Sequence, residues 1–252
     1  MPDKHFFCST SNTSLYRSKQ IFFLIINKRV PIKNHDIYSN CLNRMSLFRS
    51  TSAIVFPLVS WYSGASVSGR VFGPLADFWS WDDNDLEFKH DYIQFVFPIM
   101  EASMFNSNAP VVTVDIAQEL RTNLQCILNM KKSLNRMLLF YGFEAVPIDV
   151  GSVNNVSDSF ISCALSESSA NCDFAPFTRS VNFKQRFANW GNPGNHNHLR
   201  LTRIMRSLRI FGLYELSERL YSTLLVCVKQ HPTMVHASTL PYWKDAKEYI
   251  PF

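Results

Sequence analysis

The chain has 252 residues, of which 46% are hydrophobic, 14% aromatic and 18% charged, with only 8 Gly and 12 Pro. This composition excludes a collagen-like, low-complexity or wholly disordered chain and allows a sizeable hydrophobic core. The net charge of +5 is uneven, because residues 1–49 carry eight Lys or Arg against two acids, whereas the rest carries 17 basic and 18 acidic side chains. We call residues 1–49 the basic leader and predict that it is disordered.

The leader has no segment that predicts a membrane span. Its longest apolar run, residues 21–26, has six residues, whereas a span needs about 20 and a secretory hydrophobic region about 7–15. A mitochondrial presequence is the alternative to a disordered extension. The six cysteines form no CxxC pair and no zinc-ligand spacing, so we expect a reducing intracellular compartment and no metal. Peripheral membrane association stays open.

Apolar residues at three- and four-residue spacing predict a mainly α-helical fold. In chain order, the expected helices are a short one at 51–62 interrupted by Pro57, one from the acidic residues 82–85 to Pro98, two abutting helices between Thr113 and Gly142, one at 198–212 and a last one at 214–230. Residues 147–180 are rich in Ser, Asn and Asp and predict an irregular surface insert. We therefore expect a single compact multi-helix domain over residues 50–250.

The sequence lacks the usual catalytic fingerprints, since GxxxxGK[ST], GxGxxG after a strand and HExxH are all absent. His196 and His198 could bind a metal from an irregular loop, with His90 or Asp91 as a third ligand. Helix capping and loop hydrogen bonds explain the same two histidines more simply. We expect no catalytic residue, no metal and no cofactor; an enzyme that uses Asp91, His196 or His198 in a cleft is the alternative.

Charge is segregated between two segments. Residues 77–119 hold nine acids against Lys89 alone, and residues 184–209 hold six bases and no acid. In one interpretation, the basic helix packs beside the acidic segment through Arg–carboxylate pairs. In another, the arginines at 200–209 form a surface for phosphate, an acidic ligand or nucleic acid; we favour packing and regard nucleic acid as the weaker alternative.

Aromatic residues gather between Trp61 and Phe95 and include Trp61, Tyr62, Trp79, Trp81 and Tyr92. They could line a groove for an aromatic peptide, because such side chains give a large, rigid contact area with polar tips. Core packing is the simpler explanation.

Three strings carry a more specific signal: HDYIQFVFP at 90–98, MLLFYGF at 137–143, and FANW at 187–190 followed by NHNHLRLTRI at 195–204. Together they resemble the conserved N-terminal domain of the opioid growth factor receptor family, over about residues 60–245. Phe95 departs from the tryptophan usual in the family, the insert is long, and the leader lies outside the resemblance.

The resemblance implies a helical, non-enzymatic domain, with an association with the nucleus or its envelope. It also implies a peptide ligand, since the vertebrate receptor binds Met-enkephalin. If this chain binds such a peptide, we expect the aromatic residues between Trp61 and Trp81 to contact the ligand's rings. We expect the ligand's carboxylate to bind a group near the start of the predicted helix at 198–212, namely Asn195, His196, Arg200 and Arg203. The full set of expected ligand-binding residues is Trp61, Tyr62, Trp79, Trp81, Asp91, Tyr92, Gln94, Asn195, His196, Arg200 and Arg203.

Overall fold

The structure is a computed structural model that describes residues 56–65, 73–148 and 174–252. These residues all belong to one compact unit, Val55–Phe252. The basic leader and residues 149–173 of the predicted insert lie outside the described residues, so the predictions made for them stay predictions.

The described residues form helices and no strands, which confirms the mainly α prediction. The helices are α3 (Pro57–Tyr62), α4 (Leu75–Ser80), α5 (Asp83–Phe88), α6 (Tyr92–Val96), α7 (Val114–Thr122), α8 (Leu124–Tyr141), α10 (Phe183–Trp190), α11 (Asn197–Ile210), α12 (Tyr214–Gln230) and α13 (Thr239–Glu248). None of them is long and apolar enough to cross a membrane.

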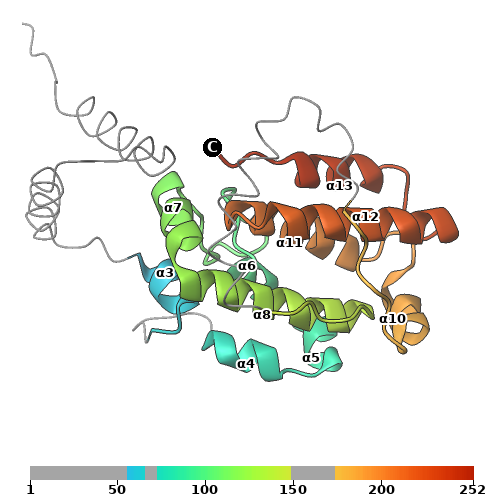
Figure 1. Ribbon diagram of the computed structural model, residues 1–252, viewed down its shortest axis with the longest axis horizontal. Helices are drawn as coiled ribbons and strands as arrows, with labels where there is room; N and C mark the ends of the chain where they lie inside the picture. Colours follow the sequence, from blue (N-terminus) through green and yellow to red (C-terminus); the bar gives the residue numbers. More distant parts are fainter. Residues whose placement is uncertain (1–55, 66–72, 149–173) are drawn as a thin grey trace, which may run out of the picture. The chain divides into compact units, whose positions relative to one another are not determined.

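Two groups of helices enclose the core (Figure 1). α11, α12 and α13 pack against one another, and α8 packs against α3, α4, α7 and α10. Buried apolar side chains from both groups fill the space between them, with Met130, Leu134 and Met137 on α8 and Leu201, Ile204 and Leu208 on α11.

The two abutting helices predicted between Thr113 and Gly142 are α7 and α8. The Thr113 hydroxyl accepts a hydrogen bond from the N–H of Ile116, and the Asn123 side chain accepts one from the N–H of Cys126. Each cap therefore starts a helix. Gly142 ends α8 with φ +87°, a conformation that favours glycine. The predicted helix at 214–230 is α12, and the one at 198–212 is α11.

The helix predicted from 82–85 to Pro98 is wrong, because the chain forms two short helices, α5 and α6, separated at Lys89–Asp91. Their apolar residues keep helical spacing across the break, so the sequence pattern does not reveal it. The Arg200 side chain marks the break: it donates hydrogen bonds to the carbonyl oxygens of Leu86, Glu87 and Lys89.

Three other features bear on the predictions. Pro57 is the first residue of α3, where a proline needs no hydrogen-bond donor, and residues 51–55 of the helix predicted at 51–62 lie outside the described residues. α13 follows the helix expected to be the last, and it buries Trp243 completely. Within the predicted surface insert, Phe177 is only 4% exposed, and its N–H donates to the Thr223 hydroxyl. Tertiary packing therefore fixes Phe177, which the sequence placed in a surface loop, and α13, for which the sequence predicted no helix.

Candidate functional site

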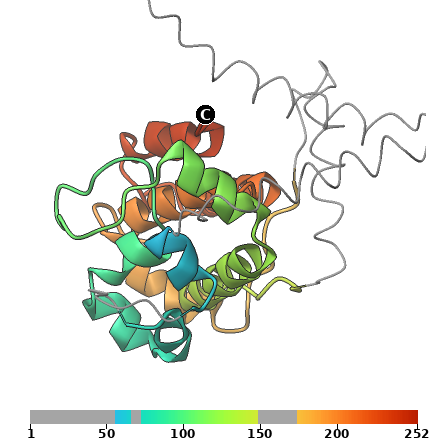
Figure 2. The ribbon, with the colours of Figure 1, turned by 90° about the vertical axis from the view of Figure 1, so that its left-hand side faces the viewer.

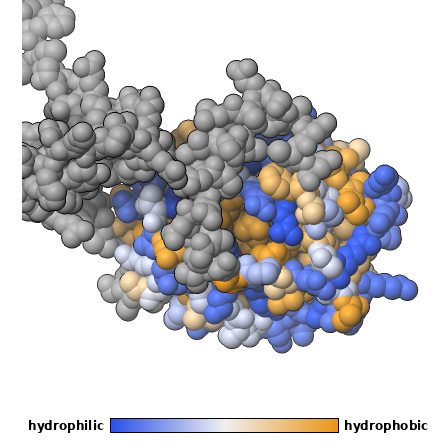
Figure 3. Space-filling view, in the orientation of Figure 1, coloured by the Kyte–Doolittle hydropathy of each residue, from blue (hydrophilic) through white to orange (hydrophobic). Residues whose placement is uncertain are grey.

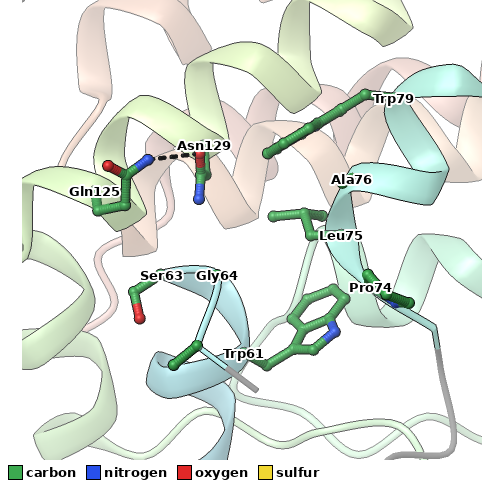
Figure 4. A pocket seen from close by; sticks show the side chains of 10 residues that line it. Trp61, Ser63, Gly64, Pro74, Leu75, Ala76, Trp79, Gln125 and Asn129 are labelled. Carbon is green, nitrogen blue, oxygen red and sulfur yellow. Dashed lines mark hydrogen bonds between the residues drawn. The ribbon is translucent and has the colours of Figure 1, made fainter. Parts of the chain in front are cut away.

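A pocket of about 490 Å³ lies between α3, α4 and α8 and is shown in Figure 4. Trp61 and Trp79 form two of its walls, and Gln125 and Asn129 of α8 contribute amides. The other lining residues are Ser63, Gly64, Ala65, Pro74, Leu75 and Ala76. Its volume lies within the roughly 300–1,000 Å³ of small-ligand sites, and it is an open hollow with an aromatic and apolar lining and two amides. We call it the tryptophan pocket.

A polar stripe on α8 holds the walls in place. The indole N–H of Trp79 donates to the Ser133 hydroxyl at 3.0 Å, and that hydroxyl donates to the carbonyl oxygen of Asn129 at 2.8 Å. The amide of Asn129 donates to the carbonyl oxygen of Tyr62 at 2.7 Å and accepts from Gln125 at 2.9 Å. Fixed hydrogen-bonded walls favour binding, because less side-chain freedom is lost when a ligand enters.

The two tryptophans were among the residues predicted from the sequence, whereas the polar side of the pocket was not predicted. The signal was present: Gln125, Asn129 and Ser133 recur every four residues along the helix, so they lie on one face. Asn129 and Ser133 are buried. Buried polar residues in a regular row need partners, and here the partners are the elements that wall the pocket.

The other expected aromatic residues lie in the core. Tyr62 and Tyr92 are fully buried, and burial raises the pKa of Tyr92 to about 12. The ring of Trp81 packs edge-on against Tyr92, with centroids 5.6 Å apart, and the Lys89 ammonium lies 4.0 Å from the Trp81 ring centroid. Trp61 is also buried at 4% exposure, but it borders the tryptophan pocket. The aromatic set therefore divides between packing and pocket.

Arg200 forms a buried clamp on the end of α5. Its Nη1 donates to the carbonyl oxygen of Leu86 at 2.7 Å and to Asn197 Oδ1 at 3.1 Å. Its Nη2 donates to the carbonyl oxygens of Glu87 and Lys89 at 3.3 and 3.0 Å. Carbonyl oxygens at a helix C-terminus carry partial negative charge, which stabilises the cation. The side chain is 5% exposed, so a ligand carboxylate would have to displace these contacts.

Arg203 differs from Arg200 in keeping one donor without a partner. Its Nε donates to the carbonyl oxygen of Phe97 at 2.8 Å, whereas its buried Nη2 has no hydrogen-bond partner. Burial lowers the pKa of Arg203 to about 10. Among the residues expected to bind a carboxylate, Arg203 is the one whose guanidinium has a buried N–H group without a hydrogen-bond acceptor.

The two histidines of the NHNH string have different surroundings. His196 Nε2 lies 3.4 Å from Glu87 Oε1, too poorly aligned for a hydrogen bond, and burial together with the Arg200 charge lowers its pKa. His198 is buried, with Nε2 donating to the carbonyl oxygen of Trp190 at 3.0 Å and with its ring against Trp243. Asn195 Oδ1 accepts from the N–H of Asn197. Neither histidine side chain caps α11, although His196 is its N-cap residue. Loop hydrogen bonds and packing, without capping, hold the string.

Asp91 is exposed at the start of α6, and Gln94 is buried beside it, with its amide placed to donate to the carbonyl oxygens of His90 and Asp91. In the part of the chain that the structure describes, no hydrogen bond joins Asp91 to His196 or His198, and no group of three His, Cys, Asp or Glu residues could hold a metal ion. The alternative of an enzyme requires Asp91 and these histidines to lie within hydrogen-bonding reach, and the described residues do not show that arrangement.

The basic helix packs on the acidic segment, but mainly through backbone carbonyl oxygens. Arg200 and Arg203 use carbonyls, as described above. Arg206 pairs with Glu101 at 3.1 Å, and Arg209 pairs with Glu218 of α12 at 3.3 Å. These four arginines thus bind groups within the domain, which leaves less of their charge for a nucleic-acid surface.

These features define a helical domain with an aromatic pocket and a buried arginine clamp. The family profile described as the opioid growth factor receptor (OGFr) conserved region matches residues 67–163 and 168–250, which is more than half of the chain. The chain therefore belongs to the opioid growth factor receptor family. The match lies inside the predicted domain of 50–250, whose exact limits stay a prediction.

The similar proteins include receptors and receptor-like proteins. The opioid growth factor receptor of Rattus norvegicus is 30% identical over 136 residues, covering 53% of this chain and 19% of that protein. Opioid growth factor receptor-like protein 1 of the same species is 28% identical over 173 residues, covering 68% and 30%. The receptor of Homo sapiens is 28% identical over 171 residues, covering 66% and 21%. The chain thus spans less than a third of these relatives. No solved structure matches it significantly.

Proposed function

We propose that this chain is a non-enzymatic binding protein that takes an aromatic side chain of a short peptide in the tryptophan pocket. The observation that carries the proposal is the pocket itself, about 490 Å³ between two indole walls and two amides. The names of the relatives, opioid growth factor receptor and opioid growth factor receptor-like protein 1, support a binding role. The intracellular location and the nuclear or membrane association implied by the resemblance are part of the same proposal.

The chemistry of the pocket favours an aromatic ring with neighbouring backbone. Indoles pack against rings in edge-on or offset geometry, which contributes about 0.5–1.5 kcal/mol beyond burial. Much of the polar capacity in the walls is already used, since the indole N–H groups of Trp61 and Trp79 donate to Gly73 O and Ser133 Oγ. Gln125 is an exposed amide of the lining and can hydrogen-bond to a peptide backbone.

A cation lies next to the pocket. The Lys132 ammonium lies 3.9 Å from the centroid of the Trp79 ring. A peptide carboxylate at this position would pair with Lys132 without breaking a buried contact. We therefore place the ligand's carboxylate at Lys132 in preference to Arg200, whose Nη groups are engaged. The roles expected for Asn195, His196 and Arg203 stay predictions.

Isothermal titration calorimetry of the full chain with Met-enkephalin, at up to millimolar peptide, tests the proposal. We expect saturable heat that weakens about fivefold or more in Gln125→Ala and Trp79→Leu, because each loses one hydrogen bond or one ring contact. Gln118→Ala removes a similarly exposed amide on α7, outside the pocket, and should leave binding unchanged. No saturable heat from a folded chain, or equal weakening in Gln118→Ala, would reject the peptide function.

A further inference from the structure

The loop between α6 and α7 carries the most exposed pair of adjacent apolar side chains in the described residues. Met104 is 91% exposed and Phe105 is 87% exposed. The loop stands away from the helices at the side of the domain, as the green loop in Figure 2 shows. On the face in Figure 3, by contrast, apolar side chains are interspersed with hydrophilic ones. The tip of the 99–112 loop is therefore a convex apolar feature.

The loop is closed at its base and ordered by its own side chains. Ile99 and Val111 form a bridge, and the N–H of Val112 donates to the carbonyl oxygen of Ile99 at 2.9 Å. At the tip, the Ser103 hydroxyl accepts from the N–H groups of Phe105 and Asn106, at 3.2 and 3.1 Å. The geometry thus presents Met104 and Phe105 outward on a fixed turn.

The same hydrogen bonds lower the cost of placing the tip in an apolar medium. Asn106 accepts from the N–H of Asn108 through its side chain and from the N–H of Ala109 through its backbone. Four N–H groups of the loop are therefore satisfied internally, and an unsatisfied one costs free energy when it leaves water. Residues 102–114 also contain no charged side chain, so no charge has to be desolvated.

The size of the tip distinguishes a lipid surface from a protein partner. Two such side chains offer roughly 300–400 Å² of surface, whereas a standard protein–protein interface buries about 800 Å² on each partner. A bilayer needs no complementary surface, and binding strength there scales with buried apolar area. We propose that Met104 and Phe105 insert into the interface of an electrically neutral phospholipid bilayer and anchor the domain reversibly at its surface.

The test is sedimentation of the full chain with phosphatidylcholine vesicles at high salt, which suppresses any attraction from the basic leader. We expect Met104→Ser/Phe105→Ser to lower the partition coefficient by about tenfold or more. Val181→Ser/Leu199→Ser is the matched control, since these residues are 99% and 69% exposed elsewhere, and it should bind like the unmodified chain. Equal binding by the tip variant and the unmodified chain would overturn the proposal.

A second measurement does not depend on losing binding. Phe105→Trp keeps the apolar character of the tip and adds an indole, whose fluorescence brominated phosphatidylcholine should quench beyond the quenching seen for the unmodified chain. Absence of that extra quenching would refute insertion. A concentration-dependent dimer in sedimentation equilibrium that disappears in the tip variant, without vesicle binding by the unmodified chain, would assign the tip to a second copy and likewise overturn the proposal.

Discussion

Replacing Arg200 by methionine tests whether the buried clamp holds α5 against α11. The substitution keeps much of the side-chain volume but removes the donors to the carbonyl oxygens of Leu86, Glu87 and Lys89. A stranded buried acceptor costs about 1–3 kcal/mol. Lys89 is exposed, so water can replace one donor. The Leu86 carbonyl keeps the hydrogen bond from the Tyr92 hydroxyl at 3.3 Å, so the Glu87 carbonyl is the one left without its donor. That stranded carbonyl, the weakened one at Leu86 and the lost bond to Asn197 give a loss of about 2–4 kcal/mol.

The assay is urea unfolding followed by circular dichroism. A loss of this size is a large fraction of the roughly 5–15 kcal/mol that stabilises a typical domain. Arg200→Lys should recover less than half of it, because an ammonium cannot reproduce the planar fork. Arg206→Ala is the control, because it removes an exposed ion pair. The side chains of Arg206 and Glu101 are 30% and 46% exposed. It should cost less than about 1 kcal/mol. A loss below about 1 kcal/mol for Arg200→Met would refute the clamp.

Two further predictions concern a glycine and a histidine. Gly142→Ala should destabilise the fold by about 1–3 kcal/mol more than Gly212→Ala. Both glycines have positive φ, but a Cβ at 142 would lie 2.8 Å from Phe183 Cα, whereas at 212 the nearest atom is 3.6 Å away; equal losses in thermal unfolding would contradict this. Burial lowers the pKa of His198 in the folded protein. The contribution of its neutral form to stability is therefore complete at pH values above the ordinary pKa of about 6.5. It is lost as the pH falls toward the lower pKa of the folded state. The free energy of unfolding should therefore fall between pH 7.5 and 5, and His198→Gln should reduce the slope; an unchanged slope would contradict the assignment.

The sequence by itself determined the helical class, the outer ends of the α7 and α8 pair at Thr113 and Gly142, and the family. These features depend on local signals. Thr113 and Asn123 accept from N–H groups three residues ahead, and Gly142 supplies a positive φ, so neighbouring residues decide each one. The family strings are local in the same sense, because each is a continuous run of residues.

Tertiary structure alone decided the break between α5 and α6 and the composition of the pocket. Arg200 reaches carbonyl oxygens more than 110 residues earlier in the chain, and no local pattern at 82–98 encodes a partner so distant. Trp61 and Trp79 face one pocket because the stripe of Asn129 and Ser133 on α8 binds α3 and α4 together. Helical spacing shows which residues share a face, but only the packing of helices distant in the chain shows what that face contacts.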